Sequence, residues 1–357
     1  MKPWIYWTLN GLGLTLVGVF VANASWLAPA PRGHMKLIAH GGTDQQFDHR
    51  GVDDATCTAQ RIEPPVHDFL ENTISGLQQA DRLGANMVQV NVAATGDGQL
   101  VLFSDWTLDC RTDGKGPVRK ATLEQVQALD PGYGYTADGG KTFPLRGLPT
   151  SRIPTVEEAV RYLPDVPIVF NLNSRNPADA ELLVKVLKGT GRNVEKLGDG
   201  FSGNEQVLAP LRQAFPKAWF LSQQRVRECT VRYLAMGWFT LVPDACKGGA
   251  IMVPQNYQWA FPGWPDRMIA RMKDANVRIV LRAPTGDGQT PVGLDLPEQM
   301  ADIPASYTGY VWVDDIWTIG PALQPAANRR TPEQEAAVQK AWEQRRKARG
   351  LPEPRVR

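Results

Sequence analysis

Short apolar segments of β-strand type alternate with segments of helical periodicity along most of this chain, and this alternation is the strongest limit on its fold. The strand candidates are residues 36–40, 86–92, 100–103, 167–172, 195–198, 219–221, 251–253, 277–281 and 310–313. The helical patterns are residues 71–83, 122–129, 154–163, 177–188, 203–214, 225–236 and 264–275. Strands that alternate with helices of about 10–15 residues predict parallel βαβ units. A closed eight-stranded barrel and a doubly wound open sheet both fit; a barrel requires that one candidate be wrong or lie outside it.

The N-terminus carries an uninterrupted apolar segment, because residues 4–27 contain no charged side chain. As a helix, such a segment spans about 30 Å of hydrocarbon. Tryptophans lie near both of its ends, where indole rings favour the membrane interface. We expect residues 1–27 to be an uncleaved membrane anchor, followed by a Pro/Gly linker at residues 28–35. A cleaved signal peptide is the alternative, since Ala22-Asn23-Ala24 fits a small-x-small cleavage site. Both interpretations export the rest of the chain.

Charge is distributed unevenly between the body and the C-terminus. The 357 residues have a formal net charge of +2, which gives no indication of nucleic-acid binding. Residues 324–357 are locally basic and contain a helical pattern at residues 331–349. A basic tail can contact anionic lipid headgroups, and a solvated charged helix is the simpler interpretation.

The four cysteines are Cys57, Cys110, Cys229 and Cys246. None has CxxC spacing and the chain has only four histidines, so a zinc site is not indicated. An even number of cysteines in an exported protein favours disulfides. We expect sequence neighbours to pair, Cys57 with Cys110 and Cys229 with Cys246; four buried free thiols are the alternative.

A series of short motifs follows the first strand candidate. They are LIAHGG (residues 37–42), LENT (70–73), LGANMVQVNV (83–92), TGDGQLVLFSDWTLDCRTDGKG (95–116) and IPTVEEA (153–159). In order and spacing, these motifs resemble the glycerophosphodiester phosphodiesterase family across residues 37–173. The resemblance implies a (β/α)8 TIM barrel, which we assign to residues 36–323, with a basic helical tail at residues 324–357. It also implies hydrolysis of glycerophosphodiesters to glycerol 3-phosphate and an alcohol, with one divalent metal ion and two histidines.

Matching the motifs position by position shows that catalytic residue types are missing. His40 matches the first histidine of the family, whereas Ser104 stands where the second belongs. Asp105, beside it, is retained, but Gly41 stands where an arginine would contact the phosphate. Serine does not titrate near neutral pH, so Ser104 cannot replace a histidine as general acid or base.

The metal-binding positions have changed in the same direction. Gln89 and Asn91 stand where the family has a Glu-x-Asp pair, and Asn171 and Asn173 stand where Glu-x-Lys is expected; Glu71 is retained. Hard divalent cations are held mainly by anionic oxygen ligands, which neutral amides do not supply. We therefore expect no metal cofactor, and Mg²⁺ or Ca²⁺ only if the protein is active.

Three functions follow as hypotheses. The first is a catalytically impaired family member that retains His40 and Glu71 and binds a glycerophosphodiester-like or other polar small molecule through positions such as Gly41, Asp105 and Asn173. The second is an active phosphodiesterase with a remodelled site that recruits Glu71, Asp105, His49 or His67. The third is a membrane-tethered binding or structural subunit. In each case the barrel would lie in the periplasm or another extracytoplasmic space, held at the inner membrane by the N-terminal helix, with the basic tail as a second candidate contact.

Overall fold

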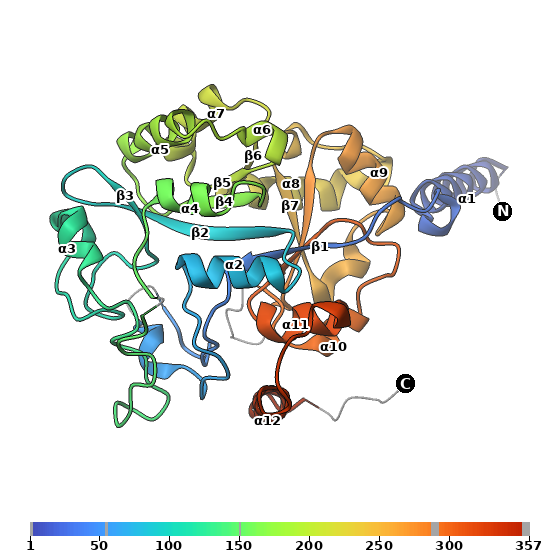
Figure 1. The fold of residues 1–357 in the computed structure, drawn as a ribbon. Helices are drawn as coiled ribbons and strands as arrows, with labels where there is room; N and C mark the ends of the chain where they lie inside the picture. Colours follow the sequence, from blue (N-terminus) through green and yellow to red (C-terminus); the bar gives the residue numbers. More distant parts are fainter. Residues whose placement is uncertain (1–2, 54–55, 150, 287–292, 352–357) are drawn as a thin grey trace.

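The protein folds as a barrel of parallel strands, seen in Figure 1. The computed structural model describes residues 3–53, 56–149, 151–286 and 293–351. Within them, eight parallel strands are ordered β6-β5-β4-β2-β1-β9-β8-β7, and a parallel bridge between Phe220 and Gly249 brings the two ends together. The barrel strands are β1 (Lys36–His40), β2 (Met87–Ala94), β4 (Ile168–Leu172), β5 (Gly200–Gly203), β6 (Trp219–Ser222), β7 (Ala250–Pro254), β8 (Arg278–Arg282) and β9 (Tyr310–Val313). The barrel is confirmed, and the open doubly wound sheet is wrong.

The sequence offers nine strand candidates for eight barrel strands, and two of these candidates are not barrel strands. The candidate at residues 100–103 is β3 (Leu100–Leu102), which pairs antiparallel with β2 outside the barrel. The candidate at residues 195–198 is wrong, because the Asn193 side chain caps a short helix, α6 (Val194–Leu197), in its place. The true strand, β5, has few large side chains because the Trp219 ring lies where a Cβ on Gly200 would project.

Helices surround the barrel. They are α2 (Ile74–Arg82), α3 (Leu123–Gln127), α4 (Val156–Tyr162), α5 (Pro177–Gly189), α7 (Glu205–Ala214), α8 (Gln223–Met236), α9 (Asp266–Asp274), α10 (Pro297–Ala301), α11 (Ile316–Leu323) and α12 (Pro332–Ala348). Threonine capping boxes begin α3 and α4. Helices α10 and α11 were not predicted, because α10 is short and α11 is apolar and buried on almost every side.

Both predicted disulfides are confirmed. Cys57 and Cys110 join the long loop after β1 to the loop after β3, with an S–S distance of 2.05 Å. Cys229 in α8 and Cys246 are joined as well, at 2.12 Å. Loop-closure entropy suggests a stabilisation of about 4 kcal/mol for the first bridge and about 3 kcal/mol for the second. The first bridge therefore holds together two segments that border the carboxyl ends of the strands.

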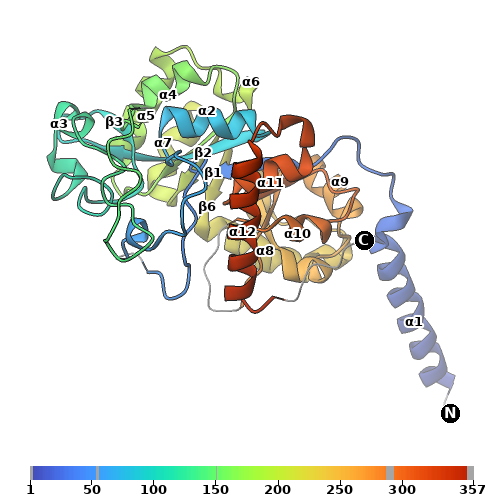
Figure 2. The same cartoon turned by 60° about the horizontal axis from the view of Figure 1, so that its bottom comes forward.

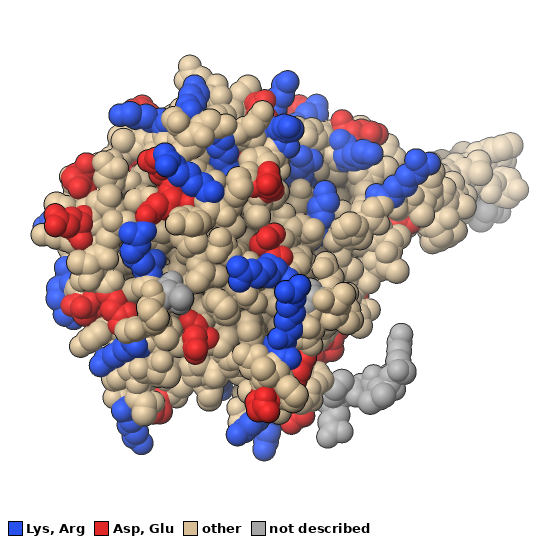
Figure 3. All heavy atoms as spheres, viewed as in Figure 1, with Lys and Arg blue, Asp and Glu red and all other residues tan. Residues whose placement is uncertain are grey.

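The N-terminal helix α1 (Pro3–Asn23) projects from the barrel and buries none of its residues. Among the described residues, α1 alone is long and apolar enough to cross a membrane, with a mean hydropathy of 1.6. Figure 3 shows α1 as a projection without charged side chains, beside a body over which both signs of charge are scattered. This geometry fits the predicted membrane anchor.

The C-terminal helix α12 lies along the barrel, as Figure 2 shows. Its arginines are engaged by carboxylates of the body: Arg345 pairs with Glu63 and Asp315, and Arg349 contacts Asp295. Arg345 is buried, with 7% of its surface exposed. This part of the predicted basic tail therefore packs as a covering element of the barrel and does not present its arginines to solvent.

Candidate functional site

The residues predicted from the sequence gather at the carboxyl ends of the barrel strands. His40 is the last residue of β1, Gln89 and Asn91 lie on β2, and Asn171 lies on β4. Strand pairing places His40 opposite Gln89, and Asn91 opposite Asn171. In (β/α)8 barrels this end carries the active site. We call it the mouth; the loops and α3 that border it lie on the left in Figure 1.

Side-chain amides hydrogen-bond one another across the mouth. The Gln89 Oε1 atom accepts from the Gly41 backbone N–H at 3.2 Å, and Gln89 Nε2 donates to Asn91 Oδ1 at 3.1 Å. Asn171 Nδ2 donates to Asn91 Oδ1 at 2.8 Å and to Asn173 Oδ1 at 2.9 Å. These predicted positions thus form one continuous set, which we call the amide network. Three of its amide oxygens already accept hydrogen bonds from within the protein.

Ser104 extends the amide network toward the loop after β3. Its hydroxyl oxygen accepts from Asn91 Nδ2 at 3.2 Å and from Asn72 Nδ2 at 2.8 Å. Asn72 Oδ1 in turn accepts from the Asn91 backbone N–H at 2.8 Å. Asn72 belongs to the LENT motif but was not predicted to join the site. The Asn72 backbone is left-handed, with φ of 57°. Nothing in the sequence indicates this conformation.

Gly41 occupies a backbone position that disfavours a side chain. Its φ is +68°, and a Cβ added there would lie 2.8 Å from the Glu71 Cβ. An L-residue at such a φ is strained, and here it would also collide with a neighbour. The local packing therefore leaves no room for an arginine side chain at position 41.

His40 is held by the carboxylate of Asp314, the residue directly after β9. Its Nδ1 atom lies 2.9 Å from Asp314 Oδ1, and Asp314 Oδ2 accepts from the Gly293 backbone N–H at 3.0 Å. Burial alone would lower the pKa of His40, but the charge and hydrogen bond of Asp314, together with the charge of Glu71, raise the pKa above its ordinary value. Asp314 was missed, although it directly follows the apolar strand segment at residues 310–313.

Glu71 and Asp105 meet a shared cation beside the mouth. The Arg111 guanidinium pairs with Glu71, and its Nε donates to Asp105 Oδ2 at 3.0 Å. The Tyr135 hydroxyl also donates to Glu71, at 2.8 Å. Burial would raise the pKa of Glu71, but Arg111 holds it below its ordinary value. Asp44 lies nearby, where burial and the Glu71 charge raise its pKa well above normal. We call these residues the Arg111 cluster.

The two histidines considered as replacements lie elsewhere. His67 Nδ1 accepts from Gln45 Nε2 at 3.0 Å, and its ring lies 4.9 Å from that of Trp317. Burial lowers the pKa of His67 to about 4. The His49 ring packs 4.2 Å from Phe47, and burial lowers the pKa of His49 as well. Both histidines serve the packing of the loop after β1.

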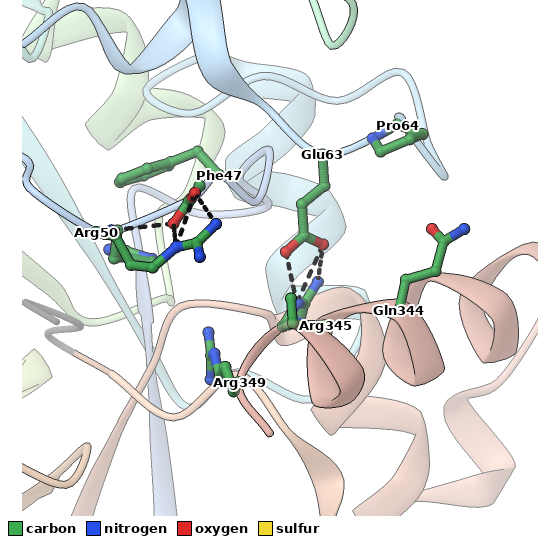
Figure 4. Close-up of a pocket in the computed structure, with 10 residues that line it drawn as sticks. Phe47, Arg50, Glu63, Pro64, Gln344, Arg345 and Arg349 are labelled. Atoms are coloured by element: carbon green, nitrogen blue, oxygen red, sulfur yellow. Dashed lines mark hydrogen bonds and ion pairs between the residues drawn. The ribbon is translucent and has the colours of Figure 1, made fainter. Parts of the chain in front are cut away.

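Two cavities are relevant to ligand binding. One, of about 200 Å³, lies between the loop after β1 and α12; in Figure 4, Glu63 and Arg345 are bonded to each other in its wall. The other, of about 400 Å³, adjoins the amide network. We call it the mouth groove, and its polar lining includes Asn171, Asn173, Ser202, Asn204, Ser222 and Gln223. The mouth groove combines volume with contact to the predicted site residues.

The donor set of the mouth does not fit a divalent metal ion. Across the described parts of the chain, no group of three or more His, Cys, Asp or Glu side chains is arranged to hold a metal. Two carboxylates near the mouth, Glu71 and Asp314, are committed to Arg111 and His40. Amide oxygens can complete a Ca²⁺ coordination shell but lack the charge that makes such a site strong.

Comparison with known proteins supports this fold. Residues 49–197 match the model of the Glycerophosphoryl diester phosphodiesterase family. An uncharacterized protein of Mycobacterium tuberculosis is 32% identical over 164 residues, which are 43% of this chain and 52% of that protein. A glycerophosphodiester phosphodiesterase of Caldanaerobacter subterraneus is 33% identical over 123 residues, 33% of this chain and 47% of the relative. The chain thus spans about half the length of these curated relatives.

Solved structures resemble the fold over a longer stretch. The glycerophosphoryl diester phosphodiesterase domain of the M. tuberculosis protein superposes with a TM-score of 0.56 at 17% identity, over 82% of this chain and 100% of that one. An Oleispira antarctica phosphodiesterase, solved with its product sn-glycerol-3-phosphate, gives a TM-score of 0.50 at 19% identity, over 82% of this chain and 97% of that one. At these identities the likeness is one of fold.

Proposed function

Because this chain carries a domain of the glycerophosphoryl diester phosphodiesterase family, we propose that it is a catalytically impaired member that binds a small polar molecule at the mouth of its barrel. The observation that carries the proposal is the closed hydrogen bonding of the amide network. Where the family would direct carboxylates at an ion, Gln89 and Asn91 direct their oxygens at protein N–H groups. An incoming cation would have to break these bonds without gaining an anionic ligand.

Acid–base chemistry is also incomplete at the mouth. His40 is positioned by Asp314 and can carry a proton, so one half of a general acid–base pair is present. The opposite position is Ser104, whose oxygen accepts from two amides. A phosphodiester hydrolase must both activate its nucleophile and protonate its leaving group, and general acid–base catalysis typically contributes 10² to 10⁴-fold to the rate. With Ser104 in place of the second histidine, one half of this acid–base catalysis is lost. The charge stabilisation that a metal ion would supply is lost as well.

A remodelled active site is the alternative, and its candidate residues are engaged elsewhere. Glu71 and Asp105 share the Arg111 guanidinium, so recruiting either carboxylate to an ion would break one of the two ion pairs that neutralise this buried cation. His67 is buried beside Trp317 with a pKa of about 4. These contacts favour the impaired member over the remodelled enzyme.

The chemistry of the mouth groove indicates the class of ligand. Amides and hydroxyls dominate its lining near Asn171 and Asn173, and its charged members, Arg175 and Glu205, are of opposite sign. Such a surface offers both donors and acceptors and suits a polyhydroxy compound of low net charge. Glycerol, a sugar or a zwitterionic glycerophosphodiester has these properties. A structural relative bound to sn-glycerol-3-phosphate makes the glycerol moiety the first choice to test.

We further propose that α1 holds the barrel at a membrane, with the barrel in an oxidising extracytoplasmic space. The exposed apolar helix and the two disulfides support this location. The alternative, a cleaved signal peptide, predicts a mature protein that lacks α1. The intact mass of the natively expressed protein distinguishes the two outcomes.

Restoring the family residues tests the proposed impairment. The native protein is expected to release no glycerol 3-phosphate from glycerophosphocholine above a protein-free blank in Mg²⁺, Ca²⁺ or Mn²⁺. The variant Gln89→Glu/Asn91→Asp/Ser104→His is expected to gain metal-dependent turnover. Gly41→Arg is added only in a second step, because of the strained backbone at this position. Gln79→Glu/Asn193→Asp adds two carboxylates away from the mouth and should gain nothing. Metal-dependent turnover by the native protein would reject the proposal.

Ligand binding needs its own measurement. Glycerol, glycerol 3-phosphate and glycerophosphocholine are compared for their effect on the melting temperature of the native protein. At least one is expected to raise it, since a ligand that binds only the folded state stabilises that state. Asn173→Ala should reduce the increase, and Arg161→Ala, on the outside of α4, should leave it unchanged. No shift with any of the three would refute this choice of ligand class.

A further inference from the structure

We infer that the barrel rests on the lipid bilayer through an aromatic patch at the end of α1, while its mouth opens into water at the opposite end of the barrel. The patch consists of Trp26, Trp238, Phe239 and Leu241, and we call it the foot patch. This inference rests on the proposal that α1 spans the membrane. It adds an orientation of the barrel and a source for the ligand, neither of which follows from the anchor alone.

The end of α1 is fixed to the barrel by a compact set of hydrogen bonds. Asn23, the last residue of α1, donates through Nδ2 to the Trp238 carbonyl oxygen at 2.8 Å. Arg271 of α9 donates to Asn23 Oδ1 at 3.0 Å, to the Ala22 carbonyl at 2.7 Å and to the Gly237 carbonyl at 3.0 Å. Arg271 thereby joins α1 to the short helical turn at Gly237–Phe239. The point where α1 leaves the hydrocarbon is therefore also the position of this turn.

The contact continues along α9 just beyond α1. The Asp266 backbone N–H donates to Ser25 Oγ at 2.8 Å. Trp26 then packs its ring 5.6 Å from that of Phe20 in the last part of α1. Residues on both sides of the junction are thus held in place. The barrel therefore cannot turn freely about the anchor.

The side chains at this junction are apolar and exposed. The exposed fractions are 70% for Trp26, 41% for Trp238, 65% for Phe239 and 52% for Leu241. Grouped exposed apolar side chains mark interaction surfaces, and indole rings favour the headgroup region of a bilayer. The occupant that suits them is lipid, because the apolar surface of α1 continues directly into this patch. A helix in the bilayer places its last turn, and whatever is bonded to it, at the interface.

The foot patch and the mouth lie at opposite ends of the barrel. The turn at Gly237–Phe239 follows α8 and leads toward the amino end of β7, whereas the amide network lies at the carboxyl ends of the strands. Figures 1 and 2 both show α1 on the right and the region of β3 and α3, which borders the mouth, on the left. A ligand consequently reaches the amide network from the aqueous phase. The ligand class is then a water-soluble molecule, and lipids still embedded in the anchoring bilayer are excluded from direct access.

Tryptophan quenching by brominated lipid tests this orientation in the full-length protein reconstituted in vesicles. Bromine atoms placed near the headgroup end of the acyl chains quench indoles at the interface. Trp238→Phe is expected to lower the quenched share of the emission. Trp106→Phe removes an indole that is 60% exposed beside β3, and it is expected to raise that share. An unchanged share in Trp238→Phe, or a lowered share in Trp106→Phe, would overturn the inference.

A second pair of variants separates contact from mere proximity. Phe239→Glu/Leu241→Glu places charge in the foot patch and is expected to reduce the quenching of Trp238. Tyr133→Glu changes an aromatic residue with 40% of its surface exposed, in the loop between α3 and α4 beside the mouth, and it should have no effect. If the patch instead bound a second copy of the chain, Trp238 would be unquenched in vesicles and cross-linking would give a dimer; either result would refute the inference. The quenching measurements do not involve the ligand, so a result that refutes the orientation does not affect the proposed catalytic impairment. Equally, metal-dependent turnover would refute the impairment without affecting the orientation.

Discussion

The amide network and the Arg111 cluster are neighbours, yet the Arg111 cluster contains paired charges whereas the amide network contains neutral side chains. In the Arg111 cluster, Glu71 and Asp105 keep their carboxylates because a guanidinium neutralises them. In the amide network, the positions where family resemblance implies carboxylates carry amides, and no arginine or lysine bonds to them in the described contacts. Buried charges persist in proteins when they are paired. The comparison indicates that a carboxylate is retained here where the chain itself supplies its partner, and is missing where a metal ion would have had to supply it.

The largest expected effect comes from removing the cation of the Arg111 cluster. Arg111→Met leaves Glu71 and Asp105 without their partner in a site where burial penalises charge. Breaking a buried ion pair by removing one partner typically costs about 3–5 kcal/mol, and we expect a loss of this size in the free energy of unfolding. Urea denaturation followed by circular dichroism measures it.

Arg161→Met provides the matched control for this change. Arg161 pairs with Glu157 on the exposed surface of α4, so its removal should cost less than about 0.5 kcal/mol. If Arg111→Met were as mild as this control, the Arg111 cluster would not depend on its cation, and the contrast with the amide network would fail.

An intermediate effect is expected from placing charge back into the amide network. Gln89→Glu/Asn91→Asp introduces two adjacent carboxylates that have no internal cation, so without metal the protein should lose about 2–3 kcal/mol of unfolding free energy. Adding Ca²⁺ or Mg²⁺ should recover it, by about 2.7 kcal/mol at a metal concentration 100 times the dissociation constant. Thermal denaturation with and without metal measures both changes.

The native protein is the reference for this experiment. Its melting temperature should not respond to either metal, since the amide oxygens of Gln89, Asn91 and Asn173 already accept hydrogen bonds from the protein. A metal-dependent rise in the native protein equal to that of the double variant would show that amides alone bind the ion, and the contrast between the two regions would disappear.

The two regions also differ in how far the sequence predicted them. His40, Gln89, Asn91, Ser104 and Asn171 were located by the motifs that resemble the family, and the structure brings all five to the mouth. The alternation of strands and helices was predicted from local patterns apart from one misplaced strand, whereas the choice of a barrel over an open sheet depended on the family resemblance. These positions could be predicted because each lies in a short sequence motif.

The partners of these residues could not be predicted from local patterns. Asp314 meets His40 from the far end of the sequence, and Arg111 reaches Glu71 across two long loops held by a disulfide. Glu71 was placed among the catalytic candidates because it is retained from the family motif, and its pairing with Arg111 was not visible in the sequence. Likewise, the arginines of α12 were considered for lipid binding because the carboxylates that pair with them lie on distant segments. Long-range pairing of charges was the information that the sequence lacked.

The smallest expected effect concerns the ion pair that lies within the mouth, which makes it the sharpest test of the comparison. Burial opposes the charge on His40, but Asp314 raises the pKa of His40 and His40 lowers that of Asp314, so the pair follows the rule of the Arg111 cluster. A raised histidine pKa stabilises the fold below about pH 6.5, and this contribution is lost as pH rises through the folded pKa. A lowered aspartate pKa stabilises the fold above about pH 3.9, and this contribution is lost as pH falls through the folded pKa. Asp314→Asn should therefore cost about 1–2 kcal/mol near pH 5.5 and less near pH 8.5, as measured by urea denaturation at both values. An equal loss at the two pH values would mean that Asp314 acts only as a neutral hydrogen-bond acceptor, and that the mouth retains no paired charge of its own.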